Sequence, residues 1–175
     1  MASAVRIVLC SGVIVMKLSD FIVTESIIPQ LKSTNRDETI AELVKSLEES
    51  GKVASNHANE IIKKLIERET QGSTGIGKGI AVPHIKHSSI TKITGTIGCS
   101  SQGIDFCSLD KAPVYSIFLL LSPPNNPDRH LEAMENLFAH LQRDRFRRFL
   151  RQADTAEAIA DLITEADEAN QDSGL

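Results

Sequence analysis

The sequence predicts an α/β domain in which helices flank a mixed β-sheet. Apolar residues recur at the spacing of an amphipathic helix in several segments of the 175-residue chain. Short apolar runs over residues 93–99 and 114–121 are bounded by Gly, Ser or Pro, as strands commonly are. The chain shows no internal repeat or low-complexity linker, and its 41% hydrophobic residues suffice for a sizeable core. We therefore expect one domain with helices packed against a sheet.

Two amphipathic helices are expected in the first half of the chain. The first covers residues 35–50, and Gly51 provides a stop signal. Its apolar face comprises Ile40, Leu43, Val44 and Leu47. The second helix begins with Asn56 as its N-cap and runs towards Glu69. Its apolar face comprises Ala58, Ile61, Ile62, Leu65 and Ile66.

The strands and a third helix are expected after residue 79. Strands cover residues 80–83, 93–99 and 114–121, and the last of these reads as the buried central strand. A turn over residues 122–128 then opens the third helix. The apolar residues of that helix are Leu131, Met134, Leu137, Phe138 and Leu141.

Two more helices complete the expected fold. Residues 143–151 form a basic helix with its charges in water, although its arginines could also meet an acidic partner surface. The residues expected to point inward are Phe146, Phe149 and Leu150. Asp154 and Glu157 form a capping box that starts the last helix. The acidic tail, residues 168–175, is expected to be disordered.

Composition excludes several classes of function. The formal net charge is −4 and the basic residues form no long block, so no nucleic-acid footprint is present. The three cysteines, Cys10, Cys99 and Cys107, are odd in number and lack CxxC spacing. They predict neither a disulfide framework nor a zinc site, and we expect them to be reduced.

The first fifteen residues, MASAVRIVLCSGVIV, are apolar but lack the features of a signal peptide. Positive charge is limited to Arg6 within the apolar run, no small-x-small cleavage site follows, and Leu9 before Cys10 is too large for a lipoprotein signal. The run is also too short to span a bilayer. We expect a cytoplasmic protein without direct membrane insertion. Residues 1–15 are then an extra strand or cover, or they precede a natural start at Met16.

The stretch GSTGIGKGIAVPHIKH, which begins at Gly72, concentrates the unusual chemistry of the chain. Gly72 and the pair Gly77-Lys78 satisfy the spacing of a P-loop, but the next residue should be Ser or Thr to hold magnesium, and it is Gly79. A helix is expected before the stretch, whereas a P-loop follows a strand. The glycines also run as GxGxG, which is not the GxGxxG order of dinucleotide-binding turns.

Exposed backbone and a histidine remain as the useful features of this stretch. Successive glycine N–H groups can form a nest that binds an anion. Pro83 fixes the backbone before His84, whose imidazole is largely neutral at neutral pH and can act as a nucleophile. A phosphoryl group is the natural charged electrophile, although spacing alone favours a purely structural turn.

The other histidines carry less signal. His87 forms His-x-x-His with His84, but no carboxylate or cysteine accompanies the pair at ligand spacing, so we expect no metal. His57 and His140 fall within expected helices and are expected at the surface or at the margin of the core.

The segment GSTGIGKGIAVPH, with Lys86 after it, resembles the signature of the type-2 EIIA family of the phosphoenolpyruvate:sugar phosphotransferase system. This is the fructose, mannitol and nitrogen-regulatory branch. Met16-Lys-Leu-Ser-Asp resembles a family start, Arg68 matches the family's basic position, and residues 114–131 resemble its buried strand and second histidine. The resemblance covers residues 16–167 and implies a mixed five-stranded sheet with helices on both faces.

The resemblance also implies roles for individual residues. His84 would carry the phosphoryl group, Arg68 would neutralise phosphate oxygens, and His130, at the start of the third helix, would bind the phosphoryl group or orient His84. From spacing alone, Arg68 is a solvated helix charge and His130 a helix-cap residue. The candidate phosphate-binding residues are Gly72, Ser73, Thr74, Gly75, Gly77 and Gly79.

The function implied is that of a histidine phosphotransferase that carries phosphate without a metal or cofactor. An HPr-like phosphocarrier protein would be the donor to His84. We expect a free-standing, nitrogen-type regulator that acts on regulatory target proteins; the alternative is a sugar-specific EIIA that passes phosphate to a IIB domain of a fructose- or mannitol-type transporter. A binding module that keeps the histidine without chemistry is the alternative from another class.

Overall fold

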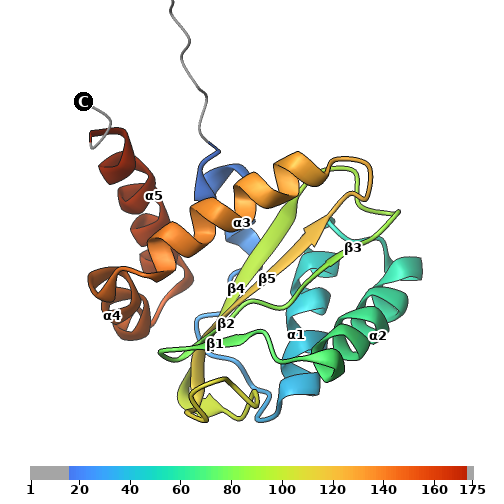
Figure 1. The fold of residues 1–175 in the computed structure, drawn as a ribbon, viewed down its shortest axis with the longest axis horizontal. Coiled ribbons are helices and arrows are strands. Elements are labelled where there is room, and N and C mark those ends of the chain that lie inside the picture. Colours follow the sequence, from blue (N-terminus) through green and yellow to red (C-terminus); the bar gives the residue numbers. More distant parts are fainter. Residues whose placement is uncertain (1–15, 173–175) are drawn as a thin grey trace, which may run out of the picture.

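The structure, a computed structural model, describes residues 16–172 and places helices on both faces of a five-stranded sheet (Figure 1). The strands are β1 (Gly75–Gly77), β2 (Ile80–Ala81), β3 (His84–Lys86), β4 (Thr94–Ile104) and β5 (Val114–Ser122). The helices are α1 (Arg36–Glu49), α2 (Ser55–Gln71), α3 (Pro127–Leu141), α4 (Asp144–Gln152) and α5 (Ala156–Asp172). Two short 3-10 helices, η1 (Leu18–Asp20) and η2 (Thr24–Ser26), precede α1. The predicted class, the mixed five-stranded sheet and the helices on both faces are confirmed.

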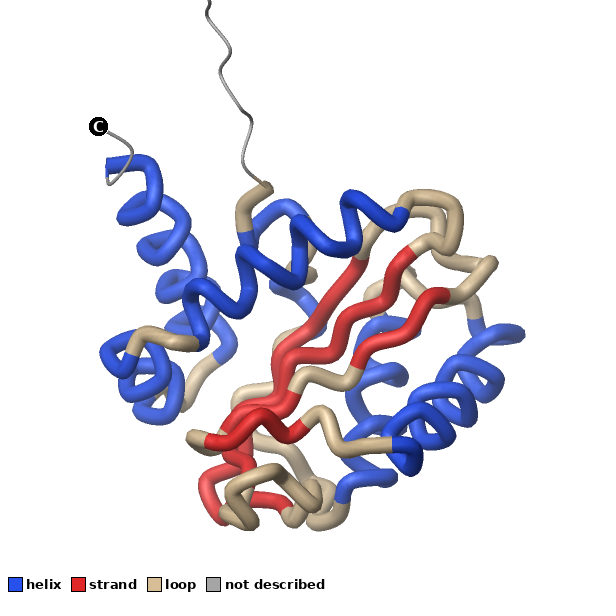
Figure 2. Tube along the Cα trace, in the orientation of Figure 1, coloured by secondary structure: helices blue, strands red, loops and turns tan. Residues whose placement is uncertain are grey.

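Strand β5 is the centre of the sheet (Figure 2). Strand β4 runs antiparallel along one side of β5, whereas β2 and β3 run parallel to it along the other side. Ala81 lies opposite Ile117 and His84 opposite Leu120, so β2 and β3 keep one register and form a single edge. Strand β1 adds an antiparallel hairpin to β2 only. Among the described residues, β3 pairs with β5 alone.

Alternate side chains of β5 serve two separate cores, as the pleat of a strand covered on both faces requires. Phe118 and Leu120 pack into the core beneath α3, α4 and α5. Ile117, Leu119 and Leu121 pack into the core beneath α1 and α2. All five are at most 1% exposed, and burial of each is worth about 1.5–3 kcal/mol. This arrangement explains why residues 114–121 read as a continuous apolar run.

Two helix starts differ from the sequence prediction. Helix α2 begins one residue before Asn56, and Ala54 occupies the N-cap position without a side-chain cap. Helix α5 is capped by Thr155, whose Oγ1 accepts from the Ala158 amide at 3.1 Å, so the capping box expected at Asp154 is wrong. Both errors are shifts of one or two residues, because neighbouring polar residues compete for the cap.

Three side chains lie at a different depth from the prediction. Leu131 and Phe149, expected to point inward, are 57% and 39% exposed. The guanidinium groups of Arg145 and Arg148 lie 5.3 and 5.8 Å from the centre of the Phe149 ring, so this ring packs between charges instead of in the core. His140, expected near the surface, is fully buried. Helical periodicity locates an apolar stripe but does not say where its edge meets solvent.

Hydrogen bonds connect the first 3-10 helix of the described chain to helix α5 near its end. The amides of Leu18 and Ser19 donate to the two carboxylate oxygens of Asp167 at 2.8 and 3.0 Å. Helix α5 continues past Asp167 to Asp172, where the sequence had led us to expect disorder. The prediction about residues 1–15 lies outside the described residues.

Candidate active site

Successive side chains of strand β3 point to opposite faces of the sheet. His84 pairs with Leu120 and Lys86 with Ser122, and opposite residues of a parallel pair share a face. Leu120 belongs to the core beneath α3. His84, Lys86 and Ser122 therefore lie on the α3 face, while His87 faces α2. His84 is thus the first residue of a strand, one residue beyond the strand expected over residues 80–83.

The Nδ1 atom of His84 forms a hydrogen bond within the protein. It lies 2.7 Å from the carbonyl oxygen of Val82, two residues earlier. A carbonyl oxygen can only accept, so Nδ1 carries the proton and donates. In the neutral imidazole the lone pair then resides on Nε2. The half-buried ring presents Nε2 as its nucleophilic atom.

His130 supplies the second imidazole of the site. Its ring centre lies 5.8 Å from that of His84, with a tilt of 39° between the planes. Its Nδ1 lies 2.7 Å from the hydroxyl oxygen of Ser122, which is fully buried at the end of β5. Burial lowers the pKa of His130 below its usual range, and the nearby His84 and Lys86 lower this pKa further. The lowered pKa favours the neutral form of the His130 imidazole at neutral pH.

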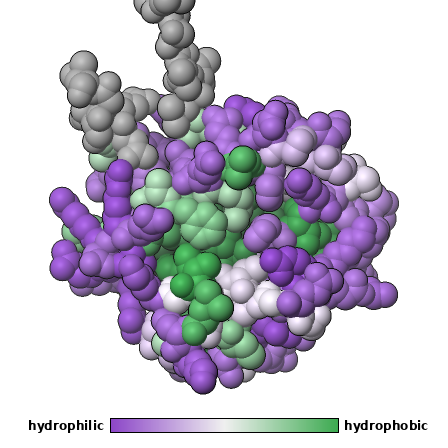
Figure 3. Space-filling model, viewed as in Figure 1, coloured by the Kyte–Doolittle hydropathy of each residue, from purple (hydrophilic) through white to green (hydrophobic). Residues whose placement is uncertain are grey.

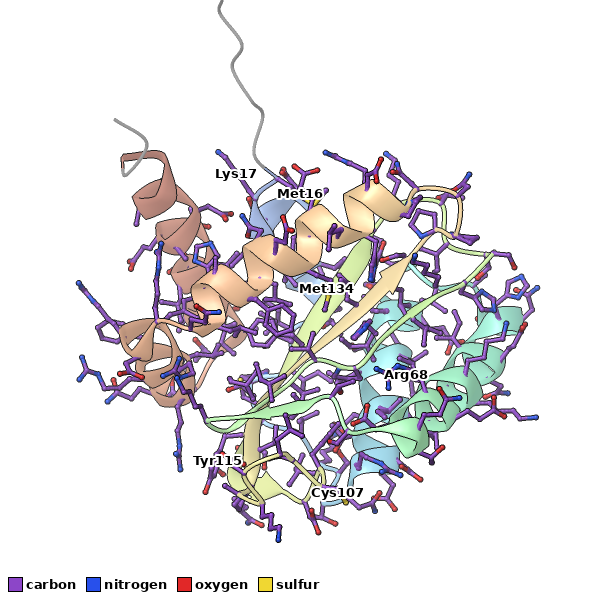
Figure 4. All side chains as sticks on the ribbon, viewed as in Figure 1. Met16, Lys17, Arg68, Cys107, Tyr115 and Met134 are labelled. Atoms are coloured by element: carbon purple, nitrogen blue, oxygen red, sulfur yellow. The ribbon has the colours of Figure 1, made fainter. Side chains whose placement is uncertain are left out.

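Arg68 lies in the last turn of α2, at the start of the glycine-rich segment. Its Nη1 donates to the carbonyl oxygen of Gly72 at 3.0 Å, and the Gly72 amide donates to the Glu69 carbonyl at 3.3 Å. The Arg68 side chain lies between α2 and the edge formed by β2 and β3 (Figure 4). These contacts hold the guanidinium beside Gly72, with the rest of its donors available to an anion.

The segment after Gly72 is fixed by a residue that the sequence reading passed over. Glu69 is only 3% exposed, and its carboxylate oxygens accept from the amide and the hydroxyl of Thr74 at 2.6 and 2.8 Å. The Ser73 hydroxyl donates to the Phe106 carbonyl at 2.6 Å and accepts from the Gly75 amide at 3.0 Å. The donors of Thr74 and Gly75 are therefore engaged within the fold, so the open anion nest expected here is not what the structure shows.

Gly77 and Gly79 form the tip of the β1–β2 hairpin with positive φ values of 89° and 77°. The Gly79 carbonyl accepts from the Ser116 amide at 3.1 Å, whereas His84 lies opposite Leu120. Four residues of a strand separate Ser116 from Leu120, which is about 13 Å. The structure therefore does not bring these two glycines to His84, and their positive φ serves the turn instead.

His87 is a structural residue. Its ring is 2% exposed, its Nδ1 lies 2.7 Å from the Ser89 hydroxyl, and its Nε2 lies 3.2 Å from the Glu60 carboxylate on α2. That separation is an ion-pair distance without the alignment of a hydrogen bond. Among residues 16–172, no group of three or more His, Cys, Asp or Glu side chains could hold a metal ion.

An apolar groove lies beside His130 along the outer side of α3. Its lining runs from His130 through Leu131, Met134 and Phe138 to Gln142. Apolar side chains are visible across this face of the molecule in Figure 3, and Met134 is labelled on α3 in Figure 4. His84 and His130 therefore lie close together, beside an apolar groove along α3.

Residues 20–166 match the family profile described as "Phosphoenolpyruvate-dependent sugar phosphotransferase system, EIIA 2". The chain belongs to this type-2 EIIA family. Members of the family are phosphoryl carriers of the phosphotransferase system, so the resemblance seen at the glycine-rich signature is confirmed.

Curated relatives of this EIIA chain come from both branches of the family. The fructose-specific EIIABC component of Bacillus subtilis is 33% identical over 152 residues, which is 87% of this chain but only 24% of that larger protein. The nitrogen regulatory protein of Bradyrhizobium diazoefficiens is 30% identical over 148 residues, which cover 85% of this chain and 95% of that protein.

Solved structures agree with the fold of this EIIA chain. The nitrogen regulatory protein IIA-Ntr from Neisseria meningitidis superimposes with a TM-score of 0.74 at 26% identity, over 82% of this chain and 97% of that one. Mannitol IIA from Escherichia coli, solved in complex with phosphorylated IIB, shares the fold with a TM-score of 0.66 at 16% identity. That match covers 81% of this chain and 95% of that chain. Of the helices in the described range, none has both the length and the apolar character needed to cross a membrane.

Proposed function

We propose that this EIIA chain accepts a phosphoryl group on Nε2 of His84 from an HPr-like phosphohistidine protein. The observation that carries the proposal is the 2.7 Å contact between Nδ1 and the Val82 carbonyl, because in the neutral ring it places the proton on Nδ1 and the lone pair on Nε2. No separate general base is then needed, since the nucleophile has no proton to lose.

The transfer exchanges one P–N bond for another. The lone pair of His84 Nε2 attacks phosphorus, the bond from phosphorus to the donor imidazole breaks, and its electron pair returns to the donor nitrogen. The phosphorylated ring keeps the Nδ1 proton, and the Val82 carbonyl stabilises the positive character that the ring gains. The reverse exchange passes the group to an acceptor without any cofactor.

The neighbouring residues suit the charge that is transferred. Transfer of this kind depends on alignment and on neutralising the equatorial oxygens. Arg68 offers guanidinium donors from the end of α2, and His130, close to the acceptor ring, offers an imidazole that can donate once an anion favours its protonated form. Ser73 remains a candidate for a backbone amide contact, whereas the Gly72 amide already donates to the Glu69 carbonyl.

We propose that the protein is a regulator of the nitrogen type, in which the phosphorylated and unphosphorylated states of His84 act differently on partner proteins. Support comes from the Bradyrhizobium relative, which matches over 95% of its own length, and from the IIA-Ntr structure. A dianionic group at His84 changes the charge beside the α3 groove, and thereby the partner that fits there. Transfer to a sugar-specific IIB domain is the second candidate, because the Bacillus subtilis fructose component is 33% identical.

The test compares wild-type protein, His84→Ala and the control His57→Ala in a phosphoenolpyruvate-driven donor mixture with and without purified HPr-like protein. We expect acid-labile, base-stable phosphate on wild type and His57→Ala only when HPr-like protein is present, and none on His84→Ala. Phosphate on folded His84→Ala contradicts the assignment. Pull-downs with free and phosphorylated protein should yield different partners; identical partners together with rapid transfer to a IIB domain favour the sugar-specific role.

A further inference from the structure

A continuous chain of hydrogen bonds joins the buried carboxylate of Glu69 to the imidazole of His84. We propose that Glu69 is the positioning residue of the site, and that it fixes the tautomer and orientation of His84 through Thr74 and Val82. The effect on phosphoryl transfer rests on the proposed function of His84, whereas the effect on the tautomer does not.

The first link in this chain is the pair of hydrogen bonds between the Glu69 carboxylate and Thr74. A carboxylate at 3% exposure needs strong partners, because an unpaired buried charge is costly. Both donors of Thr74 meet it, the amide at 2.6 Å and the hydroxyl at 2.8 Å. Thr74 is itself 6% exposed, so water does not replace either bond. Hydrogen bonds to a charged acceptor are about twice as strong as neutral ones, which makes this link the stiffest of the chain.

The second and third hydrogen bonds connect Thr74 to Val82 and Val82 to His84. The Thr74 carbonyl accepts from the Val82 amide at 3.1 Å. The Val82 carbonyl accepts from His84 Nδ1 at 2.7 Å. Val82 is 1% exposed and cannot shift independently of its neighbours. The direction of its carbonyl is therefore set by Thr74 on one side and by the edge of the sheet on the other.

Close packing restricts the backbone conformation of residues 72–75. A Cβ atom on Gly75 would lie 2.6 Å from the Ser108 Cβ and 2.8 Å from the Ser108 Cα, so the backbone already touches the neighbouring loop. On the other side, Arg68 holds the Gly72 carbonyl at 3.0 Å. The last turn of α2 thus holds both ends of residues 72–74, through Arg68 at one end and Glu69 at the other.

The tautomer is the property that distinguishes positioning from general support. A free neutral imidazole prefers the proton on Nε2, which would block the nucleophilic atom. The Val82 carbonyl imposes the Nδ1–H form instead. If Thr74 is released, the Val82 carbonyl loses its fixed direction and the intrinsic preference returns.

A matched control exists in the same chain. Asp167 is also a buried carboxylate, at 5% exposure, and its oxygens accept from two amides at 2.8 and 3.0 Å. Its partners are Leu18 and Ser19, on the first 3-10 helix, which pairs with neither β2 nor β3. Loss of Asp167 should therefore reduce stability without touching the tautomer of His84.

The experiment compares full-length wild type, Glu69→Ala, Glu69→Gln and Asp167→Ala, each shown to be folded by circular dichroism at the temperature used. The first readout is the ¹⁵N NMR spectrum of the His84 imidazole without phosphate. We expect the Nδ1–H form in wild type and Asp167→Ala, a shift towards Nε2–H in Glu69→Ala, and a smaller shift in Glu69→Gln, which keeps one acceptor oxygen.

The second readout is the rate of phosphorylation by phosphorylated HPr-like protein. Glu69→Ala should lose about 100-fold, the scale of misplacing a reacting group by about 1 Å, while Asp167→Ala stays at the wild-type rate. Wild-type tautomer in both Glu69 variants, or equal losses in Glu69→Ala and Asp167→Ala, overturns the proposal. Absence of phosphorylation in wild type itself contradicts the proposed function, while the tautomer readout still decides the role of Glu69.

Discussion

Replacing Ser122 with Ala should uncouple His130 from the sheet. The Ser122 hydroxyl is fully buried and lies 2.7 Å from His130 Nδ1, and the substitution removes this single bond without altering the backbone. A neutral hydrogen bond contributes about 0.5–1.5 kcal/mol, and because His130 is half-buried, a bond to water recovers part of the loss. We expect a loss of about 1 kcal/mol in the free energy of unfolding, which corresponds to about 2–4 °C in Tm for a domain of this size.

The assay combines urea unfolding with NMR of His130 and the phosphorylation rate of His84. Ser116→Ala is the control, because Ser116 is a buried serine on the same strand and face, whose hydroxyl lies 3.9 Å from the Cys99 sulfur. In Ser122→Ala the His130 imidazole should become mobile and transfer should slow, with His84 still the acceptor. Equal behaviour of the two variants in both NMR and rate would refute the idea that Ser122 orients His130.

Two further predictions concern stability. Burial lowers the pKa of His130 and His140 below the ordinary 6.5, with nearby Arg143 also lowering that of His140. The unfolded chain therefore binds protons more readily, so the free energy of unfolding should be highest above pH 6.5 and fall as pH decreases below it; urea titrations that show no such loss contradict the assignment. Gly98→Ala should cost about 1–3 kcal/mol, because a Cβ there would lie 2.8 Å from Leu43 Cδ2 inside a packed core, and a Tm equal to wild type would contradict this packing.

The sequence predicted the parts of the fold that depend on long apolar patterns. The apolar run of β5 and the stripes of α1 and α3 appear where expected, because both patterns must be buried whatever the details. Strand β2 lies within the strand expected over residues 80–83, but β1 and the hairpin that it forms with β2 were missed. Its strands have three and two residues and exist only because β2 pairs with β5, which no local pattern reveals.

The candidate site residues His84, His130 and Arg68 were named from the family resemblance and stay a prediction. The structure brings the two histidines together. Glu69 was passed over although a signal existed, since it continues the buried stripe of α2 that includes Ile61 and Leu65. A charged residue on an apolar stripe indicates a buried partner. The glycine-rich segment was predicted to bind an anion through its amides, because residue spacing does not show which of these amides already donate hydrogen bonds within the fold.

The open edge of β3 has a consequence for how the domain behaves among its own copies. A strand with a neighbour on one side only exposes a row of backbone donors and acceptors that a second chain could extend. Here that row is three residues long, follows Pro83, which has no N–H, and carries the exposed Lys86. Short length, proline and lysine all oppose growth of a continuous intermolecular sheet. His84 thus lies on an edge of the sheet that other proteins can reach, while these features oppose edge-to-edge association of identical molecules.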